Sequence, residues 1–527
     1  MNITRYTVLA IVVCMLFLLS WQSDDSYHGY VMARNLVEGN GFVYYVGERV
    51  NASTCPLWTL LCAGVYALCG NMYFGTILLS LFITSTAAAI LFTHCRTKRV
   101  LYLCAVLFMF SPCSIFGVSG LENSLLYLLS GILTYQLLSQ KEGLTRKKLF
   151  LIALTVALLA WTRMDIVLIF VPACVFVYLT RRQADISFIS SVFIALLGLL
   201  PFIGWELFSI FYYGFPFPNT AYAKLSAGLP ALFYVKSGIE YTFWSFVTYC
   251  AIPIALFSVL YLYRKHTYSK EHLLVLLGTV LYCLYVVYVG GDFMIGRHFS
   301  VVLYVCLILI ASLFNEQDDV RLPIYRIAAF TIMYTIAAHL LFTPFLFCDA
   351  NSSLSRKIKR HMRVDPQTQL SFLGSASFSP EITFWGYMNS SLFHINRLKQ
   401  GLTTDCFTFR SNTASYAPVQ LYHTAFGNLT YSMRGTHFID TYGLFDALIA
   451  RLPSDTDSPR IGHISRKIPE GYIESLEKGQ NCLKDEKLRC YYDHLRYIIS
   501  GDLWDAQRIK AIYDFNSGKY NELLPKY

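Results

Sequence analysis

The sequence predicts a polytopic α-helical membrane protein that carries a C-terminal mixed α/β domain outside the cytoplasm. Of 527 residues, 55% are hydrophobic and only 14% are charged, whereas about a quarter of the residues of a typical soluble protein are charged. Apolar runs fill the first two thirds of the chain, and about 20 such residues suffice to cross a bilayer. From about Cys348 these runs end, and charged residues, Gly, Pro and Asn become frequent. We therefore expect a transmembrane domain at 1–347 and a water-facing domain at 348–527.

The apolar runs indicate about eleven membrane crossings by the length criterion. The first run follows Arg5 and ends at Trp21, a residue type common at membrane interfaces, and no small-residue cleavage site follows it. It is interpreted as a retained span and not as a removed signal peptide. The predicted spans are 6–21, 72–93, 100–118, 121–138, 149–163, 165–180, 187–210, 241–262, 273–289, 299–314 and 324–347.

Basic clusters between the apolar runs predict the orientation. They lie at 94–99, 140–148, 181–183 and 264–270, and short loops rich in Lys and Arg stay in the cytoplasm. The run at 56–70 has about 14 apolar residues, roughly 21 Å of helix, which is short for a crossing. We favour a re-entrant or interfacial helix there, because a crossing would move the 94–99 cluster outside. The first loop, about 22–71, and the C-terminal domain then lie outside.

Short polar motifs gather on the predicted outer side. They are SDDSYHGYVMARNL (23–36), SGLEN (119–123), WTRMD (161–165), FPNTAYAK (217–224) and GGDFMIGRH (290–298). A transporter more often places ionisable groups near the middle of the membrane. This distribution is typical of an outward-facing enzyme with its site at the membrane boundary.

These motifs together carry a family resemblance. DDSYHGYVMARNLVEGNGFVYYVGERVNASTCPLWTLL resembles the first-loop signature of bacterial integral-membrane glycosyltransferases of the GT-C fold. Within that group the chain resembles the polyprenyl-phosphate arabinofuranosyltransferases, which include the terminal arabinofuranosyltransferases of mycobacterial cell walls. The resemblance continues in order through GLEN, TRMD, PFPNTAYAKL and GGDFMIGRHF, and into the tail as HFIDTYGLFDALIARLP and IGHISRKIPEGYIESL.

The resemblance implies transfer of a sugar, arabinofuranose, from a polyprenyl-phosphate donor to a cell-envelope glycan or glycoconjugate. It places the protein in the bacterial inner (cytoplasmic) membrane, with its site on the periplasmic side. Alternatives are another sugar passed to protein or lipopolysaccharide, a lipid-linked-sugar transporter, and a non-catalytic envelope assembly protein. No nucleotide fingerprint or phosphate loop is present. The net charge of +10 comes largely from cytoplasmic loops and the tail, so no nucleic acid is expected. The oligomeric state is left open.

Asp24 and Asp25 are the candidate catalytic carboxylates. Position alone favours a helix cap and a first-turn acid for the helix that follows, whereas the resemblance favours catalysis. Adjacent residues on a helix point about 100° apart, so both cannot face one atom. We favour Asp24 as the base that takes the acceptor proton and Asp25 as its partner. Two carboxylates would also suit a divalent ion, but no ligand set accompanies them, and no metal or other cofactor is assigned.

Arg297, His298 and Lys224 are the candidates for holding the donor phosphate. An Arg at the bilayer boundary can bind a phosphate bidentately, and a His can add a hydrogen bond. The simpler interpretation is that the side chains of Arg297 and Lys224 anchor the protein to lipid head groups. Asp292 would pair with Arg297 and hold it in position.

The supporting candidates are Glu122, Asn219, Tyr222, Arg163 and Asp165. Glu122 is either a helix N-terminal acid or a site residue. Arg163 and Asp165 are expected to form a structural ion pair. Asn219 and Tyr222 would bind sugar hydroxyls or pack a loop.

The residue pattern of the tail predicts strands at 427–433 and 436–443 and helices at 444–452, 470–478 and 487–499. An oxidising compartment would allow a bond between Cys482 and Cys490. We expect this domain to lie over the membrane site and to help hold the acceptor.

Overall fold

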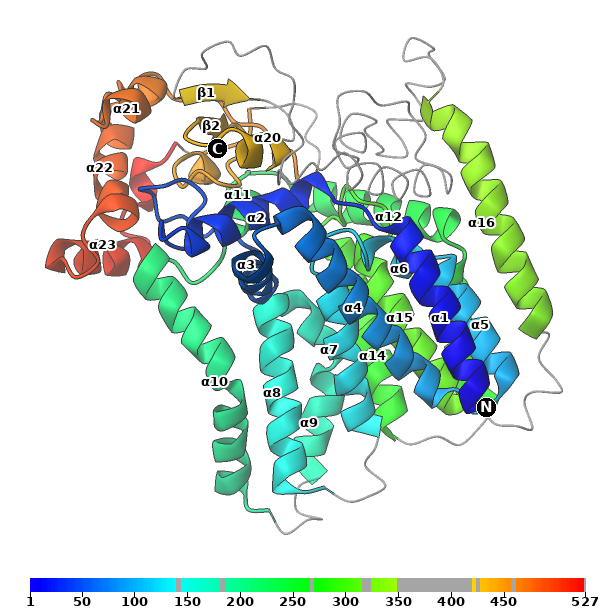
Figure 1. Ribbon diagram of the computed structural model, residues 1–527. Coiled ribbons are helices and arrows are strands. Elements are labelled where there is room, and N and C mark those ends of the chain that lie inside the picture. The colour runs from blue at the N-terminus through cyan, green and yellow to red at the C-terminus, as the bar shows by residue number, and fades with distance from the viewer. Residues whose placement is uncertain are drawn as a thin grey trace.

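A computed structural model shows a bundle of long helices with the C-terminal region seated on one end (Figure 1). The structure describes residues 1–138, 144–180, 186–265, 270–314, 324–347, 419–422, 427–455 and 461–525. The predicted domain boundary at 348, the basic cluster at 181–183 and parts of the clusters at 140–148 and 264–270 lie outside these residues. The N-terminus lies at the end of the bundle far from the C-terminal region.

The bundle surrounds one central helix, in which every side chain from Phe299 to Ala311 is buried. Its neighbours pack around it with an almost wholly apolar interface. The described helices of the bundle are α1 (Asn2–Leu19), α4 (Met72–His94), α5 (Lys98–Met109), α7 (Asn123–Leu138), α8 (Arg146–Thr162), α9 (Val171–Leu179), α10 (Phe188–Tyr213), α13 (Ala251–Lys265), α14 (Lys270–Tyr288), the central α15 (Arg297–Leu313) and α16 (Ile324–Phe347).

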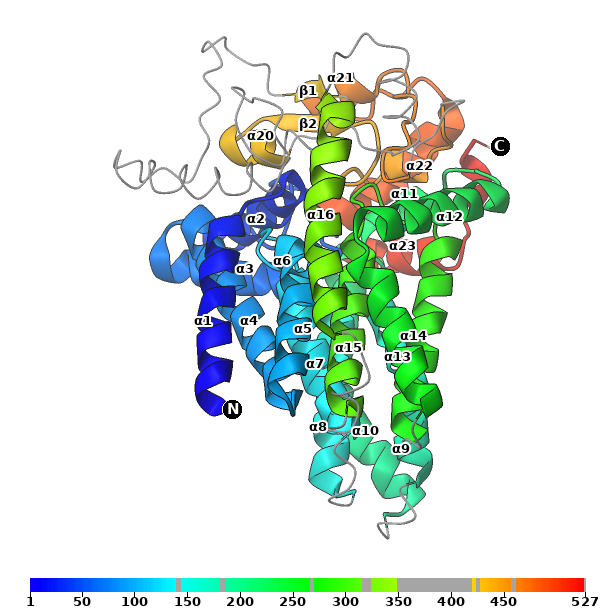
Figure 2. The same cartoon turned by 90° about the vertical axis from the view of Figure 1, so that its right-hand side faces the viewer.

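A second set of helices lies across the end of the bundle that faces the C-terminal region (Figures 1 and 2). They are α2 (Asp24–Val37), α3 (Pro56–Cys69), α6 (Pro112–Phe116), α11 (Asn219–Leu225) and α12 (Ala231–Thr248). A 3₁₀ helix, η2 (Met164–Ile169), joins α8 to α9. These elements and the loops beside them carry the polar motifs.

Several described helices can cross a membrane, so the chain is a multi-pass membrane protein. Four of them, α1, α4, α10 and α14, are long and apolar enough, and α12 with α13 makes a fifth if that bent pair is one span. The total of about eleven crossings stays a prediction.

The predicted span at 241–262 is not one continuous helix. Helix α12 ends at Thr248, α13 begins at Ala251, and their axes differ by 91°. Pro253 explains the break, because a proline lacks the N–H that a continuous helix would need and is tolerated only in a first turn. Pro112 and Pro172 likewise start new helices inside the predicted spans 100–118 and 165–180. Hydropathy alone does not show such breaks.

The short helix α3 does not cross the bundle, as expected. Arg5, near the start of α1, donates to the carbonyl of Cys95 just after α4 (2.7 Å). Gln22, just after α1, donates to the carbonyl of Tyr73 in the first turn of α4 (3.2 Å). The two helices are therefore antiparallel neighbours, and α3 begins and ends on one side. The 94–99 cluster lies on the side of the N-terminus, which confirms this part of the predicted orientation.

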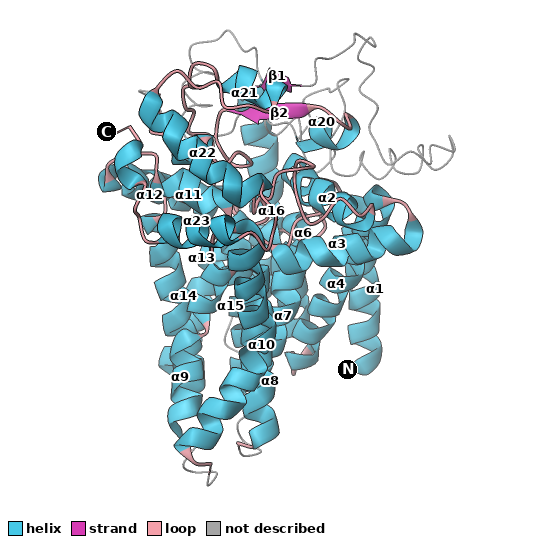
Figure 3. Ribbon diagram, turned by 90° about the vertical axis from the view of Figure 1, so that its left-hand side faces the viewer, coloured by secondary structure: helices cyan, strands magenta, loops and turns pink. Residues whose placement is uncertain are grey.

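The described C-terminal residues form a small sheet and several helices above the bundle (Figure 3). Strand β1 (Val419–Tyr422) pairs in parallel with β2 (His437–Asp440), with Val419 opposite His437. The helical elements are α20 (Gly427–Ser432), η5 (Ile449–Arg451), α21 (Tyr472–Lys478), α22 (Glu486–Ser500), α23 (Ala506–Asn516) and η6 (Asn521–Leu523). Their shared core includes Phe215 from the bundle side, so the two regions are packed together.

The secondary structure of the tail was predicted in part. The strand at 436–443 and the helices at 470–478 and 487–499 are confirmed by β2, α21 and α22. The strand at 427–433 is wrong, because α20 occupies it. The helix at 444–452 is also wrong except for η5, because the carboxylates of Asp440 and Asp446 accept the backbone N–H groups that helix formation would use. Cys482 and Cys490 are free thiols and form no bond.

Gly278 on α14 marks the tightest approach of that helix to η2. A Cβ built there would lie 1.9 Å from the carbonyl oxygen of Ile169. We expect Gly278→Ala to destabilise the protein by about 1–3 kcal/mol through overpacking. Gly204→Ala on α10 is the matched control, because a Cβ there meets nothing within 4 Å, and a helical Gly replaced by Ala gains up to about 1 kcal/mol. Thermal unfolding midpoints in detergent test this pair, and equal midpoints would contradict it.

Candidate functional site

A cavity of about 210 Å³ lies between the end of the bundle and the C-terminal loops. Seven residues that were candidates from the sequence line it, although they come from five separate segments: Asp25, Glu122, Arg163, Lys224, Asp292, Arg297 and His298. The structure therefore gathers most of the polar motifs at one point. Four further candidates do not line it: Asp24, Asp165, Asn219 and Tyr222.

The two adjacent aspartates point to different places. Asp25, in the first turn of α2, lines the cavity, with 32% of its side chain accessible there. Asp24 is buried, and its carboxylate accepts the N–H of Gly427 at the start of α20 (3.0 Å). The divergence follows from the angle of about 100° between successive helical residues. The geometry therefore favours Asp25 over the predicted Asp24 as the carboxylate that faces the cavity, and the identity of the base stays a prediction.

Glu122 is the anchor of a buried ion-pair chain. Both of its carboxylate oxygens accept from Nη2 of Arg297, at 3.0 and 3.1 Å, and one also accepts from Nη1 of Arg163 at 3.0 Å. Arg163 in turn donates from Nε and Nη2 to the two oxygens of Asp165, at 3.0 and 2.9 Å. The expected ion pair of Arg163 with Asp165 is thus confirmed. The chain holds both guanidinium groups in fixed positions, because each has two charged hydrogen bonds or more.

The other amino group of Arg297 faces the cavity. Its Nη1 lies 3.7 Å from Asp25 and 3.6 Å from Asp292, distances typical of ion pairs without a short hydrogen bond. The expected pairing of Arg297 with Asp292 is therefore confirmed. His298 follows with Nε2 at 3.8 Å from Asp292 and Nδ1 at 3.0 Å from the hydroxyl of Tyr282. Arg297 is held from behind by Glu122 and keeps one end toward the cavity.

The charge state of the cavity is set by burial and by these ion pairs. Burial raises the pKa of Asp25 to about 7, and the positive charge of Arg297 opposes that rise. At Asp292 burial acts in the same direction, but the positive charges around it, Arg297 first, together outweigh burial and hold the pKa below its usual value. Asp25 is therefore poised near neutral pH while Asp292 stays ionised.

Lys224 projects into the cavity from α11. Among the described residues, Lys224 is the lining cation that forms no ion pair within 4.0 Å, whereas Arg163 and Arg297 are both paired. A guanidinium that is paired with carboxylates must break those ion pairs before it can bind a new anion with all of its N–H groups. Lys224 is thus the cation of this cavity with its charge most available to an anionic ligand.

Asn219 and Tyr222 hold the C-terminal region onto α11 and do not reach the cavity. The amide nitrogen of Asn219 donates to the carbonyl oxygens of Gly443 and Asp446 at 2.8 and 3.0 Å. Tyr222 packs edge-on to Phe215 and lies under the guanidinium of Arg451. Of the two roles that the sequence left open for these residues, the contacts favour loop packing over the binding of sugar hydroxyls.

The roof of the cavity comes from residues that the sequence did not single out. His28 on α2 lines this roof. The other lining residues belong to the loop after β2 and to the segment 461–463: Tyr442, Leu444, Phe445, Ile461, Gly462 and His463. Asp440 shapes this roof, since its carboxylate accepts the N–H groups of Tyr442, Leu444 and Phe445. The signal that could have found these residues was the pair of tail motifs, HFIDTYGLFD and IGHISRK, which contain them.

Aromatic rings dominate that roof. The His28 ring lies 4.2 Å from the Phe445 ring, and Phe445 stacks on Tyr44 at 4.3 Å. On the other side His463 meets Phe293 edge-on at 4.8 Å. Burial lowers the pKa of His28 to about 3, so its ring is neutral. The cavity therefore has a charged floor at the bundle and a largely aromatic roof.

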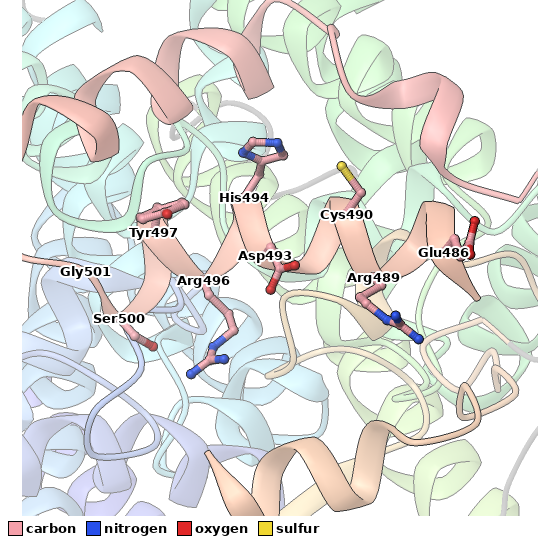
Figure 4. Close-up of a pocket in the computed structure, with 9 residues that line it drawn as sticks. All are labelled: Glu486, Arg489, Cys490, Asp493, His494, Arg496, Tyr497, Ser500 and Gly501. Atoms are coloured by element: carbon pink, nitrogen blue, oxygen red, sulfur yellow. The ribbon is translucent and has the colours of Figure 1, made fainter. Parts of the chain in front are cut away.

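A second hollow, of about 760 Å³, lies along α22 (Figure 4). Its polar side chains hold the segment before that helix: Arg489 donates to the carbonyl of Leu483, Arg496 donates to that of Gly479, and Asp493 accepts from Asn481. None of the candidate residues lies there. Among the described residues, no three His, Cys, Asp or Glu side chains group as metal ligands. The smaller cavity under the roof is therefore the candidate site.

Comparison with known proteins agrees with the motifs. Over 337 residues the chain is 27% identical to the terminal beta-(1->2)-arabinofuranosyltransferase of Corynebacterium glutamicum. These residues make up 55% of this chain and 47% of that protein. The chain is similar to the terminal arabinofuranosyltransferases. The enzyme of that name from Mycobacterium tuberculosis is 28% identical over 226 residues, 40% of this chain and 35% of that protein. The resemblance drawn from the motifs is thus confirmed.

The chain spans about half or less of the length of these two curated relatives. No protein-family model matches it. Among solved structures, arabinosyltransferase EmbB from Mycobacterium smegmatis superposes with a TM-score of 0.45 and 9% identity, over 75% of this chain and 41% of that one. ArnT from Cupriavidus metallidurans, solved bound to undecaprenyl phosphate, superposes with a TM-score of 0.46 and 12% identity. The superposition covers 87% of this chain and 86% of that one.

Proposed function

We propose that this protein is a GT-C glycosyltransferase of the bacterial cytoplasmic membrane. It transfers a sugar, arabinofuranose, from a polyprenyl-phosphate donor to a cell-envelope glycan or glycoconjugate on the periplasmic side. The observation that carries the proposal is the cavity at the bundle end that places Asp25 beside Arg297 and Lys224. Similarity to the terminal arabinofuranosyltransferases supports the choice of sugar and of acceptor class.

The position of the cavity suits a lipid-linked donor. It lies at the end of the bundle opposite the N-terminus, among elements that lie across the ends of the long helices (Figures 1 and 2). Cytoplasmic basic loops would place that end outside. A polyprenyl chain would remain in the bilayer while its phosphate and sugar enter the cavity at the membrane surface.

Asp25 is assigned the role of general base. A base works best when its pKa is close to the working pH, and the pKa of Asp25 is raised to about 7. Its carboxylate would take the proton of the acceptor hydroxyl as that oxygen attacks the anomeric carbon. The bond from the anomeric carbon to the phosphate oxygen breaks in the same step.

Lys224 and Arg297 are assigned to the leaving phosphate. Negative charge grows on that group as the glycosidic bond breaks, so fixed cations aimed at it lower the barrier. Lys224 supplies a charge without a carboxylate partner within 4.0 Å among the described residues, and Arg297 supplies Nη1 from a position fixed by Glu122. Asp292 holds Arg297 and His298 in place.

The aromatic roof is assigned to the acceptor. Neutral rings such as Phe445 and His28 offer flat faces to the C–H faces of a sugar ring. An anionic group of the acceptor would find no electrostatic attraction at these aromatic faces. The C-terminal loops would thus select a neutral glycan and present its hydroxyl to Asp25 below.

Asp25 also predicts the pH dependence of transfer. The ionised carboxylate is the active form, so protonation removes activity as the pH falls below about 7. We expect kcat/KM to drop about tenfold for each pH unit below that value and to level off above it. Initial rates between pH 5 and 9 in detergent test this expectation. A flat profile from pH 5 to 7 would exclude Asp25 as the titrating base.

A transfer assay tests the function itself. Purified protein in detergent is given polyprenyl-phosphate arabinofuranose and an arabinan oligosaccharide, and the product is identified by mass. Micelles have no compartments, so a transporter would yield no product. If only a hexosyl donor supports transfer, the proposed reaction stands but the assignment of arabinofuranose as the sugar is replaced by that hexose. Absence of transfer from every pentose and hexose donor would overturn the proposal.

A further inference from the structure

Helix α23 exposes large apolar side chains on the surface of the C-terminal region. Trp504, just before the helix, is 78% exposed, Ile509 is 50% exposed and Tyr513 is 73% exposed. Ile509 and Tyr513 are four residues apart and therefore neighbours on one face. The opposite face packs inward through Ala511. Tryptophan and tyrosine together on an exposed helical face are typical of membrane interfaces.

Two side chains attach α23 to the end of α10. Arg508 is fully buried, and its Nη2 donates to the carbonyl oxygens of Phe211 and Tyr212, both at 2.8 Å. Asn516 donates to the carbonyl of Gly214 at 2.8 Å. These acceptors belong to the last turn and cap of α10, whose carbonyls have no partners within their own helix. The position of α23 is therefore tied to the level at which α10 ends.

Helix α10 is a membrane span whose surface faces lipid. It has 26 residues, and only 17% of its most apolar window is buried inside the protein. Such a helix is roughly 39 Å long, whereas the hydrocarbon core is about 30 Å thick. Its last turns consequently reach the head-group region. The exposed residues Leu207 and Ile210 continue the lipid-facing surface up to α23.

We propose that α23 lies in the membrane interface, with Trp504, Ile509 and Tyr513 in the lipid head-group and upper acyl region. The ring of Trp504 lies 4.9 Å from that of Phe211, so the exposed surface is continuous from α10 to α23. Figure 3 shows α23 running across the top of α10, as an in-plane helix would. The bilayer thereby supports the C-terminal region from below, and with it the loops that roof the cavity.

Lipid quenching tests this placement in the full-length protein. Wild type and Trp504→Phe are reconstituted singly in nanodiscs, with and without phospholipids brominated near the head of the acyl chain. The difference in emission between the two proteins reports Trp504. We expect the brominated lipid to quench most of that difference and water-soluble acrylamide to quench little of it. Trp58→Phe is the matched control, because Trp58 is 3% exposed and its difference emission should respond to neither quencher.

Two results would overturn the proposal. Quenching of the Trp504 signal by acrylamide but not by brominated lipid would place that ring in water. Protection from both quenchers, together with cross-linking of two copies in detergent, would assign the surface to a second chain. If Trp504→Phe folds poorly, the Tyr513→Trp protein replaces it, with wild type as its reference. Its added emission is expected to be quenched by brominated lipid in the same way.

Discussion

Replacement of Asp25 by Asn is expected to lower kcat for sugar transfer by about 10²–10⁴-fold, the contribution typical of a positioned general base. Asn has nearly the same shape but cannot take a proton. It also keeps an amide oxygen that can accept from Arg297, whose Nη1 lies 3.7 Å from the present carboxylate. The donor KM should therefore change little. Single-turnover rates with saturating donor and acceptor provide the measurement.

Asp24→Asn is the matched control for that experiment. Asp24 accepts the N–H of Gly427 at 3.0 Å and does not line the cavity. An amide oxygen can accept the same hydrogen bond, so transfer should stay within a few-fold of wild type. The acidic limb of its pH profile should also persist. Equal losses in Asp24→Asn and Asp25→Asn would contradict the assignment of the base to Asp25.

Replacement of Glu122 by Gln is expected to cause the largest loss of stability. The carboxylate of Glu122 is 2% exposed and neutralises Arg297 and Arg163 together. Removing one partner of a buried pair leaves an uncompensated charge and costs about 3–5 kcal/mol. Arg297 also loses the support that aims its Nη1 into the cavity. The thermal unfolding midpoint in detergent should fall clearly, and the transfer rate should fall with it.

A surface pair provides the control. Lys478 and Glu474 form an ion pair within α21 whose side chains are 60% and 42% exposed. Glu474→Gln should leave the unfolding midpoint unchanged, because solvent-exposed pairs contribute little. Glu122→Asp should recover part of the lost stability by restoring the charge at a shorter reach. A normal midpoint for Glu122→Gln would show that the ion-pair chain does not hold this end of the bundle together.

Most of the candidate site was predictable because its residues stand in short polar motifs at the ends of apolar runs. Composition decides which residues lie at a membrane boundary, and the basic loops indicate which boundary. These local signals placed Asp25, Arg297 and Lys224 at one boundary, the family resemblance made them site candidates, and the structure brings them to one cavity. They also predicted that the short helix α3 would not cross.

The errors share one cause, which is contact between residues far apart in the chain. Asn219 has the residue type and position of a sugar ligand, but it pairs with carbonyls more than 220 residues later. The roof residues, such as Phe445, come to the cavity from the opposite end of the sequence. The bend after Thr248 was hidden in an apolar run, since hydropathy does not record helix direction.

By itself the sequence determined that this is a membrane protein, that its polar motifs gather at one boundary, and that an aspartate pair stands among them. Only the tertiary structure decided which aspartate faces the cavity. Both residues are acidic, adjacent and in the same helical turn, so no local property distinguishes them. The distinction comes from Gly427, some 400 residues later, whose N–H binds Asp24. The turn of about 100° between neighbours then directs Asp25 toward Arg297.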